Sequence, residues 1–167
     1  MPGADLDAIA LALVNLSQLV CDFTEIAELE INPLLADARG VIVLDARPKA
    51  FYEGTSGPWR ARGHIPGAIS LPWRSLMDDA NPALFKSNDE LDTILEGHGV
   101  DRFRTVICTC GTGREATNEF VLLKWLYRYP NVRLYEGSIT EWTRYPDNPV
   151  VTGPRAREER TEAAPAR

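Results

Sequence analysis

The hydrophobic pattern of the chain predicts strands and helices in alternation. Residues 41–46 and 105–108 predict strands, and the continuous apolar run at residues 41–44 is typical of a strand buried on both faces. Residues 132–135 predict a third strand. Apolar residues at helical spacing predict a helix over residues 114–129, which ends before Pro130. Because strand, loop and helix alternate, we expect an α/β fold around a central, mainly parallel sheet.

Weaker signals cover the rest of the middle of the chain. The glycine- and proline-rich residues 48–70 are expected to be mostly irregular, with a short helix near residues 49–53. A second short helix is expected at residues 91–97.

The two ends of the chain show different patterns. Residues 6–22 predict a helix that is apolar nearly all round, followed by a strand at residues 27–35 and a hairpin loop with Gly40 near its end. Residues 154–167 contain no aromatic residue, and their polar composition predicts a disordered tail. The predicted divisions of the chain are therefore residues 1–40, 41–153 and 154–167.

Composition and charge narrow the class of protein. The 167 residues fit one main domain, and the net charge of −6 argues against a generally basic nucleic-acid binder. Three cysteines do not make the framework of a disulfide-rich secreted protein. The apolar stretch 9–20 is too short for a membrane span, and it follows Asp5 and Asp7, where a signal peptide is positive. We expect a cytoplasmic protein that binds neither nucleic acid nor membrane.

The segment around Cys110 carries the candidate chemistry. Cys110 stands at the end of a predicted strand, Gly111 and Gly113 let the backbone curl, and a long helix follows. Backbone N–H groups of such a loop and the helix N-terminus favour negative charge, and Arg114 adds a positive one. We therefore expect the pKa of the Cys110 thiol to lie below that of a free thiol. The alternative is an inert core cysteine.

Four motifs, in this order, resemble those of the rhodanese-like sulfurtransferases over residues 41–153. They are Leu44-Asp45-Ala46-Arg47; Gly63-His64-Ile65-Pro66-Gly67-Ala68 with Leu71-Pro72-Trp73; the loop from Cys110 to Glu115; and Tyr135-Glu136-Gly137-Ser138 with Glu141-Trp142. The resemblance implies a three-layer fold with helices on both faces of the parallel sheet. We expect neither a cofactor nor a metal.

The resemblance also implies that Cys110 accepts a sulfane sulfur. Its thiolate would attack the outer sulfur of an anionic donor such as thiosulfate, form a persulfide, and pass the sulfur to cyanide or to a thiol, which a protein could carry. The loop residues expected to bind the donor and the persulfide are Gly111, Thr112, Gly113, Arg114 and Glu115.

Departures from the family's motifs bear on the identity of the donor. Pro66 stands where double-domain thiosulfate enzymes have an Arg, and the loop ends Gly-Arg-Glu where mercaptopyruvate enzymes have Gly-Val-Thr. The family often has an aromatic residue at the position of Arg60. We expect Arg114 to grip an anionic group of the donor, whereas Glu115 would oppose an anion unless it turns away.

Two other functions compete with sulfur transfer. A phosphatase of the same fold needs an Arg six residues after the cysteine, but Ala116 stands there and Arg114 comes too early. A non-catalytic module that binds a partner through the same loop would usually have lost the cysteine, which this chain keeps.

Several residues near the loop are expected to be structural. Asp45 and Arg47 are expected to form a buried ion pair near the site. His64 is expected to make a structural hydrogen bond, because a thiolate held in such a loop needs no general base. Cys108 is expected to be a buried thiol, since a disulfide bond to Cys110 would be strained.

The N-terminal residues resemble the end of the ATP-grasp domain of ADP-forming acyl-CoA synthetases. The resemblance includes Glu-Ile-Asn-Pro at 30–33 and Leu-Asp-Ala at 44–46, and in that family the Asn and Asp at the positions of Asn32 and Asp45 bind Mg²⁺. The segments that form the nucleotide pocket have no counterpart here, and two ligands make no Mg²⁺ site without phosphates. We expect a structural remnant whose last strand becomes the first strand of the central sheet.

Overall fold

The described part of the chain is built around a four-stranded sheet. The computed structural model describes residues 40–154. The strands are β1 (Val41–Asp45), β2 (Ala68–Ser70), β3 (Thr105–Thr109) and β4 (Val132–Leu134). Their order in space is β2–β1–β3–β4, and β1 pairs in parallel with β2 as β3 does with β4. The predicted strands β1, β3 and β4 and the parallel sheet are thus confirmed.

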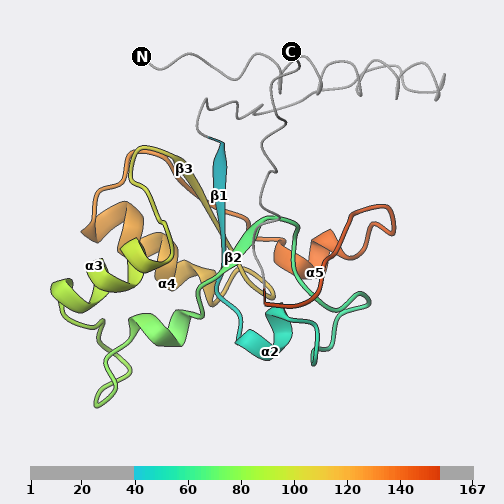
Figure 1. Ribbon diagram of the computed structural model, residues 1–167, viewed down its shortest axis with the longest axis horizontal. Helices are drawn as coiled ribbons and strands as arrows, with labels where there is room; N and C mark the ends of the chain where they lie inside the picture. The colour runs from blue at the N-terminus through green and yellow to red at the C-terminus, as the bar shows by residue number, and fades with distance from the viewer. Residues whose placement is uncertain (1–39, 155–167) are drawn as a thin grey trace, which may run out of the picture. The chain divides into compact units, whose positions relative to one another are not determined.

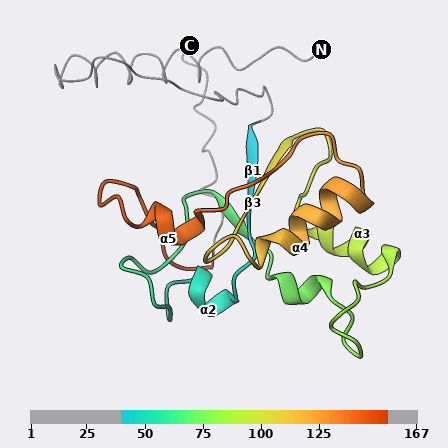
Figure 2. The same cartoon turned by 180° about the vertical axis from the view of Figure 1, so that it is seen from behind.

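Helices lie on both sides of this sheet. They are α2 (Lys49–Tyr52), the 3₁₀ helix η1 (Trp73–Leu76), α3 (Asn88–Gly97), α4 (Ala116–Val121), the π-helix η2 (Leu122–Leu126) and α5 (Ser138–Trp142). Figure 1 shows α3 and α4 to one side of the strands and α2 and α5 to the other, and the reverse view agrees (Figure 2). This is the predicted three-layer arrangement.

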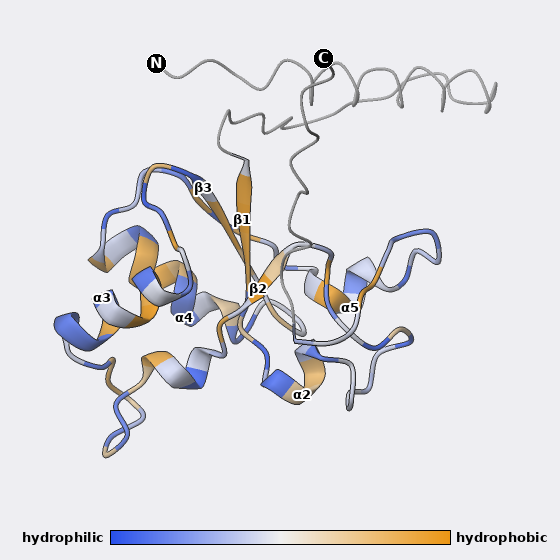
Figure 3. Cartoon of the chain, viewed as in Figure 1, coloured by the Kyte–Doolittle hydropathy of each residue, from blue (hydrophilic) through white to orange (hydrophobic). Residues whose placement is uncertain are grey.

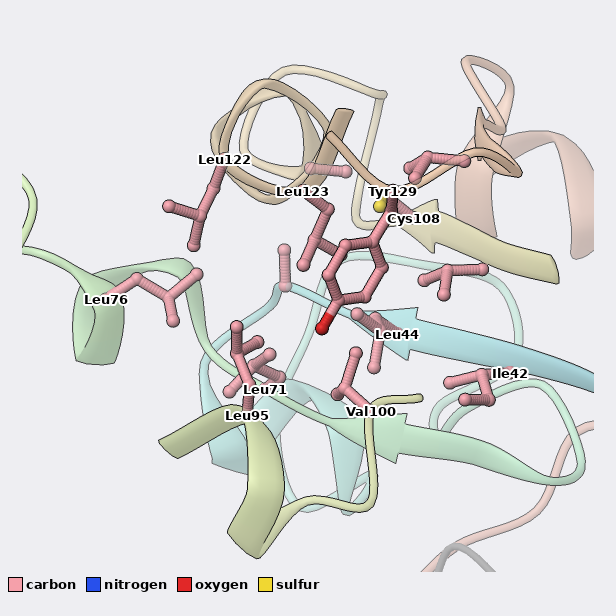
Figure 4. Packing of buried hydrophobic residues seen from close by; sticks show 14 of the residues in the cluster. Ile42, Leu44, Leu71, Leu76, Leu95, Val100, Cys108, Leu122, Leu123 and Tyr129 are labelled. Carbon is pink, nitrogen blue, oxygen red and sulfur yellow. The ribbon is translucent and has the colours of Figure 1, made fainter. Parts of the chain in front are cut away.

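The core fills both sides of the two central strands. Leu44, Val106 and Cys108 are 0% exposed, so β1 and β3 are buried as their apolar runs predict. The colouring of β1 in Figure 3 shows the same hydrophobic run. Leucines from α3, η2 and the segments between strands pack against these strands (Figure 4). The expectation that Cys108 is a buried, unpaired thiol is confirmed.

The helix predicted for residues 114–129 differs from the one observed. The α-helical part ends at Val121, and a π-helical turn follows, in which the Tyr127 N–H donates to the Leu122 carbonyl. A π-helix turns through a smaller angle per residue than an α-helix. The neighbouring Leu122 and Leu123 can therefore both face the core, while Trp125 is 66% exposed.

Four further elements were not expected from the sequence, or begin earlier than expected. β2, η1 and α5 are short, and β2 lies within the stretch expected to be irregular. α3 begins three residues before residue 91, because Ser87 and Glu90 form a capping box at its start. The expected helix at 6–22, the strand at 27–35 and all of the tail after Pro154 lie outside the described residues.

Candidate functional site

Cys110 lies at the carboxyl end of β3, where a parallel sheet places its ligands. The end of β1 is next to it, since the Ala46 N–H donates to the Thr109 carbonyl at 2.9 Å. The loop from Cys110 to Glu115 then leads into α4, with the start of α5 beside it (Figure 2). Three elements distant in sequence therefore meet at the cysteine.

Ser138 fixes the shape of this loop. The N–H groups of Cys110 and Gly113 both donate to the Ser138 hydroxyl at 3.0 Å, and that hydroxyl donates to the Tyr135 carbonyl. Ser138 is buried and has a φ of 51°, a strained conformation for a residue other than glycine. Sequence reasoning gave Ser138 no role, although it belongs to one of the four motifs.

The loop carbonyls face α5. The Cys110 carbonyl accepts from the Ile139 N–H at 3.1 Å, and the Gly111 carbonyl accepts from both the N–H and the hydroxyl of Thr140. With its carbonyls held on that side, the loop directs the N–H groups of Thr112 and Ala116 toward the Cys110 sulfur. The predicted group of N–H donors around the sulfur therefore forms in part.

Gly113 is placed differently from the other loop residues that are predicted to bind the donor. The Gly113 N–H donates to the Ser138 hydroxyl, and the residue is buried. Gly113 does not line the cavity beside the cysteine. Its φ of 82° and its close approach to the Glu136 backbone, 2.9 Å from where a Cβ would lie, explain why glycine is needed there. Gly113 shapes the loop instead.

The expectation of a low pKa for the Cys110 thiol is wrong. Burial is the largest effect and raises the pKa of the thiol, and the neighbouring Glu115 carboxylate raises it further, against the lowering effect of the Ala116 and Thr112 N–H groups. The Cys110 residue is 0% exposed. The sequence shows the N–H donors and Arg114 but not the desolvation, which arises only from tertiary packing.

Glu115 turns toward the cysteine rather than away from it. The Cys110 thiol donates a hydrogen bond to the Glu115 carboxylate. Burial raises the pKa of that carboxyl, but the hydrogen bonds from Cys110, from its own backbone and from Arg114 outweigh burial, and the pKa is lowered. The Arg114 guanidinium lies 3.3 Å from the carboxylate, and its side chain is 86% exposed.

A cavity of about 230 Å³ opens beside the loop. Four of the five loop residues predicted to bind the donor line it. The full lining is Arg47, Pro48, Phe51, Pro58, Trp59, Gly111, Thr112, Arg114 and Glu115. The volume suits a small anion rather than a large substrate.

Trp59 forms a wall of the cavity that sequence reasoning missed. Its indole N–H donates to the Thr140 hydroxyl at 2.8 Å, and its ring meets Phe51 edge-on. A Cβ at Gly111 would lie 2.9 Å from the Trp59 ring, so a larger residue there would force the ring to move. The sequence held one sign of this wall, since Trp59 is an aromatic residue one position before Arg60, where the family often has an aromatic residue.

Asp45 and Arg47 form the predicted buried pair. The Arg47 Nε donates to Asp45 Oδ1 at 2.8 Å, and the Arg47 Nη2 donates to Asp45 Oδ2 and to the Gly63 carbonyl. The guanidinium carbon lies 4.8 Å from the Trp59 ring centre. The pair therefore lies against the Trp59 wall of the cavity.

His64 is placed as a structural residue. Its Nδ1 lies 2.8 Å from the Tyr52 carbonyl and its ring stacks on the Tyr52 ring at 3.6 Å. It does not line the cavity. Within residues 40–154, no group of three or more His, Cys, Asp or Glu side chains is placed to hold a metal ion, and no helix is long and apolar enough to cross a membrane.

Comparison with known proteins agrees with this geometry. A profile of the rhodanese-like domain matches residues 30–145. The chain belongs to the rhodanese-like family. Over 111 residues, the rhodanese-like chain is 39% identical to the 3-mercaptopyruvate sulfurtransferase of Escherichia coli K12, covering 65% of this chain and 38% of that protein. It is 34% identical over 113 residues to the thiosulfate sulfurtransferase of Pseudomonas aeruginosa, covering 68% of this chain and 41% of that protein.

A solved structure and a second profile complete the comparison. The crystal structure of Tum1 from Saccharomyces cerevisiae matches with a TM-score of 0.60 and 32% identity, over 71% of this chain and 41% of that one. The chain spans about two fifths of the length of these relatives. An ATP-grasp domain profile matches residues 1–49, which confirms the predicted resemblance there and includes β1.

Proposed function

We propose that this rhodanese-like chain transfers sulfane sulfur through a persulfide on Cys110. The observation that carries the proposal is the position of Cys110, at the end of β3, with two backbone N–H groups directed at its sulfur. Family membership supports it, and so do relatives named as thiosulfate and 3-mercaptopyruvate sulfurtransferases.

The proposed reaction has two steps. The Cys110 sulfur attacks the outer sulfur of the donor, a new S–S bond forms, and the donor's remainder leaves with the electron pair of the broken bond. The N–H groups of Thr112 and Ala116 stabilise the negative charge on the sulfur. A thiol or cyanide then takes the outer sulfur and returns Cys110 to its starting state.

The donor is a small anion in this proposal. The exposed Arg114 guanidinium at the cavity rim supplies a positive charge to attract it, while Gly111 and Thr112 offer backbone along one wall. Because Cys110 is fully buried, the donor reaches the sulfur only when a side chain of the cavity wall moves. Thiosulfate and mercaptopyruvate both fit the size of the cavity.

A donor panel tests the proposal. Thiosulfate, mercaptopyruvate and glutathione persulfide are each offered with cyanide as acceptor, and thiocyanate is measured. The wild type and Cys108→Ser are expected to turn over at least one donor, and Cys110→Ser none. Equal turnover by Cys110→Ser would disprove the role of Cys110.

A further inference from the structure

Glu115 places a carboxylate in a loop whose other groups favour the binding of an anion. The loop, its N–H groups and Arg114 all favour a negative charge, yet a carboxylate already occupies the space beside the thiol. The Glu115 Oε2 lies 3.9 Å from where a Cβ on Gly111 would be, against the wall of the cavity. A side chain that only repelled the donor would weaken the function proposed above.

The contact with the thiol gives the carboxylate another use. The Cys110 thiol donates to Glu115, and burial leaves no solvent in contact with the cysteine to accept its proton. The side chain of Glu115 is 27% exposed, so a proton that it accepts can pass on to water. Glu115 therefore joins the buried sulfur to the solvent.

We propose that Glu115 is the proton acceptor for Cys110 when the sulfur attacks the donor. This rests on the proposed sulfur transfer. The thiol proton moves to the carboxylate as the Cys110 sulfur bonds to the outer sulfur of thiosulfate. The S–S bond of thiosulfate breaks, sulfite leaves with the electron pair, and the proton follows to give bisulfite. The products are the Cys110 persulfide anion and bisulfite, which carry the charge of −2 that thiosulfate brought.

Proton transfer to Glu115 also avoids a second negative charge beside the donor. With the proton on Glu115, the pair of Cys110 and Glu115 keeps the single negative charge of its resting state, whereas loss of the thiol proton to solvent would leave two when the dianionic donor arrives. Arg114 lies beside the carboxylate, while Arg47, which lines the same cavity, is already neutralised by Asp45. Ser138 and Thr140, from α5, carry no charge.

The pH dependence of persulfide formation distinguishes a proton acceptor from a repelling charge. The reactive form, with the proton on Glu115, is a tautomer of the resting form, so its population does not change with pH between the two pKa values. We expect the single-turnover rate of sulfite release from thiosulfate to be nearly flat from pH 6 to pH 8 in the wild type. If the donor panel identifies mercaptopyruvate as the donor, the same experiment uses mercaptopyruvate and measures the release of pyruvate.

The isosteric variant Glu115→Gln removes the acceptor and keeps the shape of the site. We expect its rate to be on the order of a hundredfold lower at pH 6 and to rise about tenfold per pH unit, as a reaction that needs prior loss of the thiol proton does. Its Cys110 is expected to react with iodoacetamide at lower pH than in the wild type, because the repelling charge is gone. Glu115→Asp should recover part of the flat profile. Glu96→Gln, at an exposed position of α3, loses the same charge away from Cys110 and should match the wild type.

The outcomes separate the inference from the proposed function. If Glu115→Gln is faster than the wild type at neutral pH, Glu115 only repels the donor. If the variant has the same pH profile as the wild type, Glu115 has no part in the reaction. In either case the inference fails while the proposed sulfur transfer stands. If the wild type forms no persulfide with any donor, sulfur transfer fails and the inference with it.

Discussion

At the scale of single residues, the site depends on close approaches and on buried charge. Gly111 lets the Trp59 ring close the cavity, and Glu115 reaches the buried thiol. Near Cys108, the Glu119 carboxyl is 0% exposed and neither of its oxygens has a hydrogen-bond partner. The hydrophobic pattern did not single out Glu119, because a charged residue within a helix is usually on the surface.

Gly111→Ala should damage the cavity more than the fold. The new methyl group would lie 2.9 Å from the Trp59 ring, which has to move. We expect sulfur transfer to slow on the order of tenfold to a hundredfold through misplacement of the site. We expect the free energy of unfolding to fall by about 1–3 kcal/mol. Gly97→Ala, where nothing lies within 4 Å, is the control and should change neither; equal loss in both variants would contradict this account.

Glu119 should make stability depend on pH. Burial raises its pKa well above the ordinary value of 4.5, with Asp45 adding to the effect. Below pH 4.5 the carboxyl is protonated in both states and ionisation costs nothing. As pH rises above 4.5 the unfolded chain loses this proton first, so the free energy of unfolding falls.

Glu119→Gln removes this titration. We expect the variant to gain stability relative to the wild type between pH 5 and pH 8, measured by urea unfolding at each pH. A difference that stays constant across that range would show that Glu119 is charged in the folded protein.

At the scale of elements, the site is the meeting point of β3, the loop and α5. The strands β1 and β3 could be predicted because they are buried on both faces and so are continuously apolar. The three residues of β2 are too few to show a period, and the π-helical turn η2 follows from the packing of Leu122 and Leu123. The hydrogen bond from Trp59 to Thr140 joins residues 81 apart, so no local pattern indicates it.

Ser138→Ala tests how α5 holds the loop. The change leaves the buried N–H groups of Cys110 and Gly113 without their acceptor, which we expect to cost about 1–3 kcal/mol of stability. Persulfide formation should slow as well, because the Thr112 and Ala116 N–H groups lose their alignment. Ser75→Ala, which removes one hydroxyl hydrogen bond in η1, serves as the control and should leave the reaction rate unchanged. Full activity in Ser138→Ala would mean that the loop keeps its shape without α5.

At the scale of the whole molecule, two family profiles overlap on one strand. The ATP-grasp profile ends at residue 49 and the rhodanese-like profile begins at residue 30, so β1 belongs to both matches. We propose that residues 1–40 are a structural remnant, as their sequence predicts, and that they precede a rhodanese-like domain at residues 41–153. In this domain the Asp45 carboxylate oxygens accept hydrogen bonds from Arg47.

The full chain should not bind Mg-ATP with useful affinity. Mg²⁺ would have to compete with the Arg47 guanidinium for Asp45, and the sequence offers no recognisable cradle for a triphosphate. Calorimetry with the full chain and Mg-ATP checks this, and we expect no heat of binding. A dissociation constant in the micromolar range would show that the remnant interpretation is wrong.

The most direct measurement of the central claim is the location of the transferred sulfur. The wild-type chain is incubated with the donor that the panel identifies, without an acceptor, and its intact mass and peptides are determined by mass spectrometry. We expect a gain of one sulfur atom on the peptide that contains Cys110, lost again when cyanide is added and unaffected by Cys108→Ser. A sulfur atom on Cys108 instead, or a gain that persists in Cys110→Ser, would contradict the account.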